Sequence, residues 1–205
     1  RMGERDPGNK PQSNDRIPYC YIDKSNLKCT ICQTKVNPDK CKCVNCITYN
    51  ASFVILPGVG SAKSVMDGLK TNSLVDTIKG LDKPVLGICI GMHVLFDSSE
   101  EQSTTCLGVI SGDIKKFKLK NDLKVPQMGW NEVTFLQDNI KNLDNYYYFA
   151  NSYYSEIYSY TLATAVHGLS YAAVVQKDNF LGCQFHPEKS SLAGEKFLDY
   201  FFKVS

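Results

Sequence analysis

The chain has 205 residues and a formal net charge of +2 at pH 7, which is close to neutral. This length can bury one good hydrophobic core, so we expect one domain with an appendage. The charge gives no reason to expect nucleic acid or an anionic membrane as a partner. No apolar run approaches the roughly 20 residues that span a bilayer, and the polar start lacks the apolar stretch of a signal peptide. A soluble, cytoplasmic protein is therefore expected.

The first 46 residues differ in composition from the rest of the chain. They carry nine Lys/Arg against five Asp/Glu, few aliphatic residues, and six of the nine cysteines. No helical or strand periodicity is visible in them. We therefore divide the chain into an atypical Cys-rich segment, residues 1–46, and a domain, residues 47–205. The segment is expected to be disordered, stapled by zinc, or foreign to the fold of the domain.

The cysteines of this segment leave a zinc site open as an alternative. Two Cys-x2-Cys pairs could supply the four thiolates of a tetrahedral site, and these are Cys29, Cys32, Cys43 and Cys46. The gap between the pairs is short for a zinc ribbon, and incidental thiols in an aberrant segment are the favoured interpretation. We expect the protein to need no metal and no cofactor.

The domain begins with alternating strand and helix signals. Residues 52–56 and 84–88 are short apolar runs typical of buried strands. Ser61 is a suitable N-cap for a helix with apolar residues at helical spacing from Ala62 to Leu69. A second helical run, residues 92–96, follows the second strand without a gap. This order predicts an α/β fold with a parallel sheet covered on both faces.

The second half of the domain is richer in strand signals. Strands are predicted at residues 131–135, 146–150, 161–166, 172–176 and 180–185, separated by turn residues. A final amphipathic helix is predicted at residues 193–202, with Phe197, Leu198, Phe201 and Phe202 on its apolar side.

Cys89 lies between two glycines where a buried strand meets a helix, in the segment Gly87–Gly91. This pattern is typical of a nucleophile elbow, in which a tight turn holds the nucleophile in a strained backbone conformation. Glycines are needed there because side chains would clash with the turn. A helix N-terminus also favours thiolate over thiol. Taken alone, the pattern is equally compatible with a buried structural cysteine.

A candidate base follows a later strand. His186 precedes Pro187 at the end of an apolar run, and Glu188 is placed to hydrogen-bond the imidazole. Nucleophile, base and orienting carboxylate form the set that covalent acyl transfer requires. A lone histidine is more often a packing residue, but His-Pro-Glu paired with a cysteine elbow favours catalysis.

Oxyanion donors are predicted beside the elbow. The glycine-rich segment Pro57–Gly60 ends the neighbouring strand, where doubly wound sheets place their sites. The backbone at Gly58 and Val59, together with the N–H of Ile90, could stabilise a developing oxyanion. The alternative is a plain strand-to-helix turn.

Several segments together resemble the class I (triad-type) glutamine amidotransferases, and in particular the glutaminase subunits of imidazole glycerol phosphate synthases. The resemblance covers about residues 47–205 and implies the flavodoxin-like fold of that family, a mixed, mostly parallel sheet with helices on both faces. It rests on Pro57–Gly60, Gly87–Met92, Lys124–Asn131, Tyr148–Tyr154 and Gln184–Ser190.

The resemblance also implies an activity and a partner. Cys89 would attack glutamine, His186 and Glu188 would assist, and glutamate would leave after hydrolysis of a thioester. The ammonia would pass to a (β/α)8-barrel synthase in a heterodimer, where it contributes to imidazole glycerol phosphate in histidine biosynthesis. The expected partner interface comprises Met128, Trp130, Asn131 and Asn151, and the expected glutamine-binding positions are His93 and Gly60.

Three departures from the family pattern stand out. His93 replaces a glutamine that holds the substrate, Asn151 replaces an interface histidine, and residues 1–46 replace the usual opening strand, turn and helix. Two alternatives to the leading function remain open, one because related subunits share the same motifs and one because of these departures. One is an ammonia-supplying subunit of a nucleotide-sugar amidating system, and the other is a regulatory homologue without activity.

Overall fold

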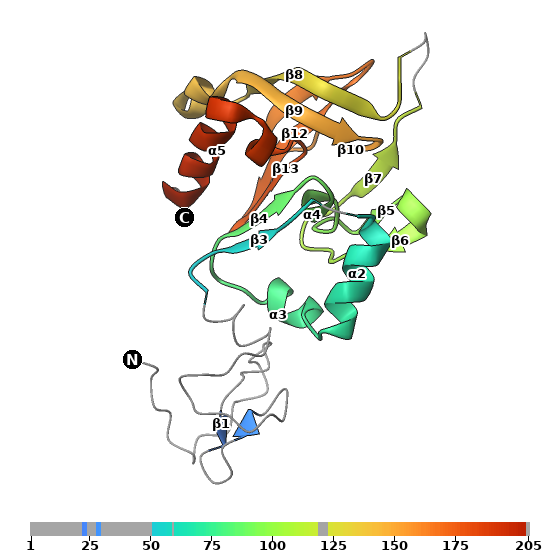
Figure 1. Cartoon of the computed structure of the whole chain (residues 1–205), viewed down its shortest axis with the longest axis vertical. Helices are drawn as coiled ribbons and strands as arrows, with labels where there is room; N and C mark the ends of the chain where they lie inside the picture. The colour runs from blue at the N-terminus through green and yellow to red at the C-terminus, as the bar shows by residue number, and fades with distance from the viewer. Residues whose placement is uncertain (1–21, 24–27, 30–50, 59, 119–122, 204–205) are drawn as a thin grey trace.

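We analysed a computed structural model, which describes residues 22–23, 28–29, 51–58, 60–118 and 123–203. Strands β3 to β13 form one 11-stranded sheet, and β1 and β2 pair separately. Figure 1 shows α2 and α5 on different sides of the larger sheet. The strands are β1 (Ile22–Asp23), β2 (Lys28–Cys29), β3 (Val54–Leu56), β4 (Val85–Ile88), β5 (Ser98–Ser99), β6 (Thr104–Thr105), β7 (Asp113–Lys116), β8 (Gln127–Phe135), β9 (Asn145–Asn151), β10 (Tyr153–Ser155), β11 (Thr161–Val166), β12 (Ser170–Lys177) and β13 (Phe180–Cys183).

Among the described residues the helices are fewer than the strands. The α-helices are α2 (Ala62–Thr71), α3 (Val75–Lys79), α4 (Ile90–His93) and α5 (Ser191–Lys203), and the 3₁₀ helices are η2 (Glu101–Ser103), η3 (Asp138–Leu143) and η4 (Pro187–Lys189). Within the described part of the chain, none is long and apolar enough to cross a membrane.

The sheet is mixed, as expected, and its parallel part carries the elbow. β4 pairs in parallel with β3 on one side and with β13 on the other, with Ile88 opposite Cys183. β5 and β7 form the remaining parallel pair in the described residues, and the other pairings there are antiparallel. The α/β class is confirmed, although the parallel share is smaller than the strand–helix alternation indicated. Hairpin connections such as β12–β13 explain the difference, since short loops can join only antiparallel neighbours.

The first predicted helix is confirmed together with its cap. Ser61 accepts a hydrogen bond from the Ser64 N–H, and the Ser64 side chain accepts one from the Ser61 N–H, which is a reciprocal capping box. Met66 and Leu69 lie buried on the inner side of α2, whereas Lys63 and Asp67 pair on the exposed side. The apolar spacing and the cap thus predicted both the start and the orientation of this helix.

The predicted helix at residues 92–96 is wrong in its extent. The helix α4 ends at His93, and the chain then passes through turns. The carbonyls of Val94 and Phe96 are taken by the N–H groups of Leu107 and Gly108, at 2.8 and 2.7 Å. Carbonyls held by another segment cannot continue the i→i−4 ladder, so tertiary contacts end the helix early.

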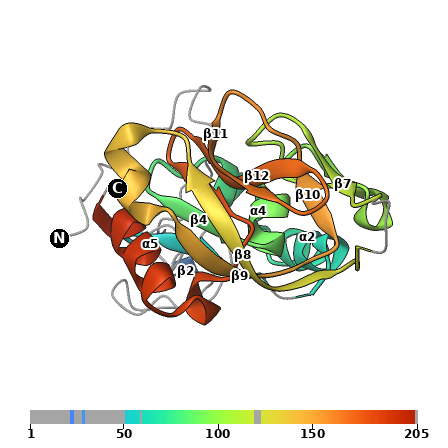
Figure 2. The same cartoon turned by 90° about the horizontal axis from the view of Figure 1, so that it is seen from above.

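The core near the C-terminus is aromatic. Phe197 and Phe201 of α5 are buried, and Phe197 meets Phe185 edge to face at 5.0 Å between ring centroids. Phe185 also stacks on Tyr147 of β9 at 4.1 Å. Phe202 is 45% exposed, so the apolar side of α5 is narrower than predicted. In Figure 2, α5 lies beside β9, far from α2. Through Phe185, this cluster fixes the segment that leads to His186.

Candidate active site

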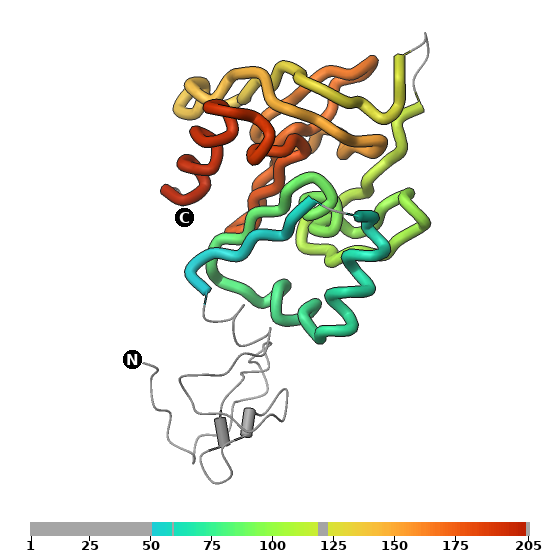
Figure 3. Tube along the Cα trace, in the orientation of Figure 1, coloured from blue at the N-terminus to red at the C-terminus, as the bar shows by residue number. Residues whose placement is uncertain are grey.

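The turn from β4 into α4 is a tight elbow centred on Cys89. The φ angle of Cys89 is 51° and its ψ angle is −107°, a conformation that non-glycine residues rarely adopt. A Cβ on Gly91 would lie 1.9 Å from the Leu56 carbonyl oxygen, and one on Gly87 would lie 2.5 Å from the Gly91 oxygen. Glycines at both positions therefore allow β3, β4 and α4 to approach this closely. In Figure 3 the elbow lies centrally, between the α2–α3 part of the trace and the later strands.

The glycine-rich loop after β3 lies against the elbow. A Cβ on Gly58 would lie 2.7 Å from the Cys89 Cβ, so these two residues are direct neighbours. Gly60 has a φ angle of 92° and adjoins the cap of α2. Val59, the second predicted oxyanion residue, lies outside the described residues. Of the two loop residues predicted to be oxyanion donors, the described part of the structure therefore places Gly58 beside Cys89.

Burial sets the protonation state of Cys89 in this structure. The side chain is 4% exposed, and desolvation raises the pKa of its thiol to about 11. The negative charges of Glu188 and Glu101 raise this pKa further, while the Ile90 N–H and the Gln184 amide lower it by hydrogen bonding to the sulfur. The thiol is thus protonated at neutral pH and requires a base to become a nucleophile.

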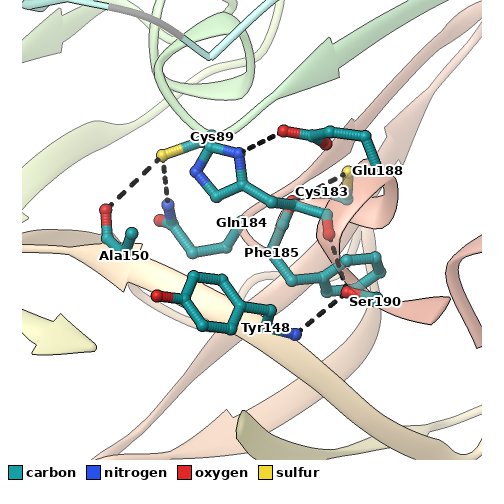
Figure 4. Close-up of polar contacts among 9 residues, drawn as sticks. Cys89, Tyr148, Ala150, Cys183, Gln184, Phe185, Glu188 and Ser190 are labelled. Atoms are coloured by element: carbon teal, nitrogen blue, oxygen red, sulfur yellow. Dashed lines mark hydrogen bonds and ion pairs between the residues drawn. The ribbon is translucent and has the colours of Figure 1, made fainter. Parts of the chain in front are cut away.

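His186 is held as a base would need to be. Its Nδ1 lies 2.7 Å from Glu188 Oε1, and its side chain is largely buried while that of Glu188 is about half exposed. Figure 4 shows this contact as a dashed line to Glu188 beside Cys89. A carboxylate bound at Nδ1 leaves Nε2 free to accept a proton. Because β13 lies parallel to β4, both strands end at the same edge, and Cys89 and the His186–Glu188 pair meet there.

The backbone of His186 is clamped from two directions. Its N–H donates to the Tyr148 carbonyl at 2.8 Å. The fully buried Ser190 hydroxyl donates to the His186 carbonyl at 2.7 Å and accepts from the Tyr148 N–H at 2.9 Å. Sequence reasoning missed the role of Ser190. The available signal was a serine four residues after the histidine, within a short helical turn.

Ser190→Ala should weaken both the fold and the placement of His186. The variant leaves one buried N–H and one buried carbonyl with one bond fewer, a loss worth about 1–3 kcal/mol. Thermal unfolding of Ser190→Ala and of Ser170→Ala, a control on the exposed part of β12, measures the difference. Equal melting temperatures for the two variants would contradict the clamp.

Three further neighbours of the site carry no local sequence signal. The Cys89 Sγ lies 4.0 Å from the Ala150 carbonyl oxygen and 3.7 Å from Gln184 Nε2. The Glu101 carboxylate accepts a hydrogen bond from the Ala62 N–H at 2.7 Å, beside the glycine-rich loop. Each of these contacts joins residues at least 39 positions apart along the chain. Only the folded sheet reveals them.

His93, predicted to bind glutamine, is 1% exposed. Its Nε2 lies 2.7 Å from Gln184 Oε1. Burial lowers the pKa of the imidazole to about 4, and the bond to Gln184 opposes this shift. The ring is therefore neutral at physiological pH and faces Gln184.

The predicted interface residues divide into two groups. Met128 and Trp130 are 64% and 55% exposed, and they line a groove of about 590 Å³ together with Asn131. Asn151 lies opposite Gln127 in the β8–β9 pair and is buried, with its amide donating to the Tyr153 carbonyl at 3.0 Å. Of the predicted interface residues, Met128 and Trp130 of β8 are therefore exposed to a partner, whereas the side chain of Asn151 is not.

The zinc alternative falls largely outside the described residues. Cys32, Cys43 and Cys46 are not among them, whereas the backbone of Cys29 belongs to β2, which pairs with β1. In the part of the chain that the structure describes, no cluster of His, Cys, Asp and Glu could hold a metal ion.

Comparison with known proteins places these features in a family. Residues 20–204 match the family model "Glutamine amidotransferase class-I". Imidazole glycerol phosphate synthase subunit HisH 2 from Legionella pneumophila (strain Philadelphia 1) is 43% identical over 159 residues, covering 75% of this chain and 79% of the relative. The subunit of the same name from Campylobacter jejuni (strain RM1221) is 43% identical over 155 residues, covering 75% and 80%. A crystal structure of a glutamine amidotransferase superposes with a TM-score of 0.58 at 15% identity, covering 75% of this chain and 78% of that chain, which supports the fold alone.

Proposed function

Because the chain belongs to the class I glutamine amidotransferases, we propose that it is the glutaminase subunit of an imidazole glycerol phosphate synthase. In this role it hydrolyses glutamine to glutamate and ammonia, and the ammonia passes to a (β/α)8-barrel synthase subunit. The observation that carries the proposal is the meeting of the strained Cys89 elbow with the His186–Glu188 pair at one edge of the sheet. The names of the relatives support the choice of pathway.

The chemistry follows from the roles that these groups can take. His186 removes the thiol proton as the Cys89 sulfur attacks the carboxamide carbon of glutamine. The oxyanion that forms is stabilised by the Ile90 N–H and by the loop at Gly58. Collapse of this intermediate breaks the C–N bond, and His186 returns the proton to the departing ammonia. Water, deprotonated by His186, then cleaves the γ-glutamyl thioester and releases glutamate.

Glu188 acts on His186 rather than on the substrate. Its carboxylate accepts the Nδ1–H bond at 2.7 Å, which fixes the tautomer and stabilises the imidazolium that forms in each step. Its half-exposed position limits the electrostatic gain, because solvent screens the charge. Orientation of the ring is therefore its main contribution.

The barrel partner docks on the exposed apolar surface of β8. Met128 and Trp130 are large, exposed and adjacent to the groove, a combination typical of interface anchors. Trp130 packs edge to face on Tyr148, whose backbone holds His186. A partner on this surface would thus contact Trp130, which packs on the residue that binds the backbone of His186. The cytoplasmic location of the protein and the domain boundary at residue 47 remain predictions. Every described residue of the site lies after residue 47.

Trp130→Ala should weaken the complex with the barrel subunit. An anchor of this kind contributes at least about 2 kcal/mol, equivalent to roughly a 30-fold increase in the dissociation constant. Isothermal titration with the purified barrel measures it. Leu192→Ala is the matched control, because Leu192 is 71% exposed on α5 and lies outside the groove. An equal effect of both substitutions would remove β8 from the interface.

A glutaminase assay distinguishes the proposed function from its two alternatives. A subunit of histidine biosynthesis releases glutamate when the cyclase barrel of that pathway is added. A subunit of a nucleotide-sugar amidating system does so only with another synthase, and a regulatory homologue does so with neither. Glutamate release measured with each partner therefore separates the three.

A further inference from the structure

Three buried side chains form a hydrogen-bonded series that ends on the nucleophile. His93 Nε2 lies 2.7 Å from Gln184 Oε1, and Gln184 Nε2 lies 3.7 Å from the Cys89 sulfur. His93 and Gln184 are 1% and 0% exposed. Figure 4 shows the Gln184 amide pointing at the sulfur from the side opposite the elbow backbone. The series joins α4 to the segment after β13.

The direction of the series follows from the neutral imidazole, which carries one N–H. Among the described residues, no atom bonds His93 Nδ1. A proton on Nδ1 would leave a buried N–H unpaired, whereas a proton on Nε2 is satisfied by Gln184 Oε1. We therefore assign the N–H to Nε2. With its oxygen held in this way, the Gln184 amide must present its NH₂ group to the sulfur.

We propose that His93 is a positioning residue, which holds the Gln184 amide so that its N–H is directed at Cys89 and favours the thiolate. The inference rests on the proposed function in taking Cys89 as the nucleophile. It assigns His93 a role that does not require contact with glutamine. The position departs from the family residue, but an imidazole N–H there can still orient the neighbouring amide.

Other groups act on the same sulfur and must stay constant in a test. Glu188 and Glu101 act on it through their negative charge, Ile90 through its backbone N–H, and the buried Cys183 thiol is a further titratable neighbour. For His93 itself, Gln184 is the polar side chain that faces the ring in the described residues. Substitutions at His93 leave the other four groups in place.

The test is the rate at which iodoacetamide alkylates Cys89 in the full chain, followed from pH 6 to pH 10. Peptide mass spectrometry separates Cys89 from the other cysteines. His93→Leu should slow alkylation at neutral pH by about tenfold, which corresponds to a rise of about one unit in the thiol pKa. Gln184→Leu should do the same. The double variant should be no slower than Gln184→Leu, because His93 acts only through Gln184. His93→Gln, which keeps an N–H donor, should restore the rate.

Two results would overturn the inference. One is an additive loss in the double variant, which would show that His93 acts independently of Gln184. The other is an unchanged alkylation profile in His93→Leu, which would show that His93 does not act on the Cys89 thiol. If His93→Leu does not fold, His93→Asn replaces it, since the shorter amide cannot reach Gln184. Alkylation needs neither glutamine nor partner, so failure of the proposed function leaves this test intact.

Discussion

Cys89→Ala should abolish glutamate release in the presence of the barrel partner while leaving the fold intact. In the proposed mechanism the sulfur forms the thioester, so its removal should lower the rate by at least about 10⁴-fold. The alanine side chain fills most of the same buried space, and the strained φ of 51° is imposed by β4, α4 and their glycines rather than by the thiol. A glutaminase assay with the barrel present measures the loss.

The matched control is Cys106→Ala. Cys106 is also a buried free cysteine, but its sulfur contacts the Thr104 carbonyl instead of the site. This variant should keep its activity. Circular dichroism establishes that both variants are folded. Glutaminase activity retained in Cys89→Ala would refute the thioester mechanism, whereas an inactive wild type with every barrel tested would favour the regulatory alternative.

Gly91→Ala should be the most destabilising glycine substitution in the elbow. The new methyl group would meet the Leu56 carbonyl at 1.9 Å, and the clashing atoms belong to the backbone of β3. Because neither α4 nor β3 can move without opening the sheet, we expect a cost of about 3 kcal/mol or more. For a chain of this length this lowers the melting temperature by roughly 6–12 °C. Activity should fall too, because the displaced β3 carries the loop at Gly58.

Gly68→Ala is the control of opposite sign. Gly68 lies within α2, and a Cβ there would meet nothing within 4 Å. Alanine should therefore stabilise the helix by up to about 1 kcal/mol. Differential scanning calorimetry of the two variants compares the melting temperatures. A melting temperature of Gly91→Ala equal to that of the wild type would show that the close approach of β3 and α4 is not required.

The elements that the sequence predicted well are those determined by local pattern. The buried run before Cys89, the capped helix from Ala62 and the strand before His186 each combine a clear apolar period with an end signal. Their relation also follows, because strands that share a parallel edge bring their ends together. For this reason the sequence alone could predict that Cys89, His186 and Glu188 lie at one edge of the sheet.

The elements that the sequence did not predict depend on contacts between distant segments. The helix at Cys89 ends at His93 because the loop at residues 107–110 binds the carbonyls of residues 94–96, which could otherwise continue the helix. The burial of His93 against Gln184 joins positions 91 apart. The Ser190 clamp needs the β9 backbone at Tyr148 beside η4. None of these three contacts produces a periodic pattern or a residue spacing that can be recognised in a single sequence.

The burial of Cys89 also determines how the site can react. Burial of Cys89 keeps the thiol protonated at neutral pH, since its pKa is about 11. In the proposed mechanism, His186 therefore removes the thiol proton during catalysis, and the N–H donors at Ile90 and Gln184 assist. We therefore expect little glutamate release from the chain alone.

We propose that this chain supplies ammonia to a barrel synthase in the histidine pathway. The most direct measurement is formation of imidazole glycerol phosphate by the purified barrel and its ribonucleotide substrate, with glutamine as the sole nitrogen source. Adding this chain should start product formation, with about one glutamate released per product. The claim is contradicted if the barrel makes product from ammonium salts but remains inactive with glutamine after the chain is added.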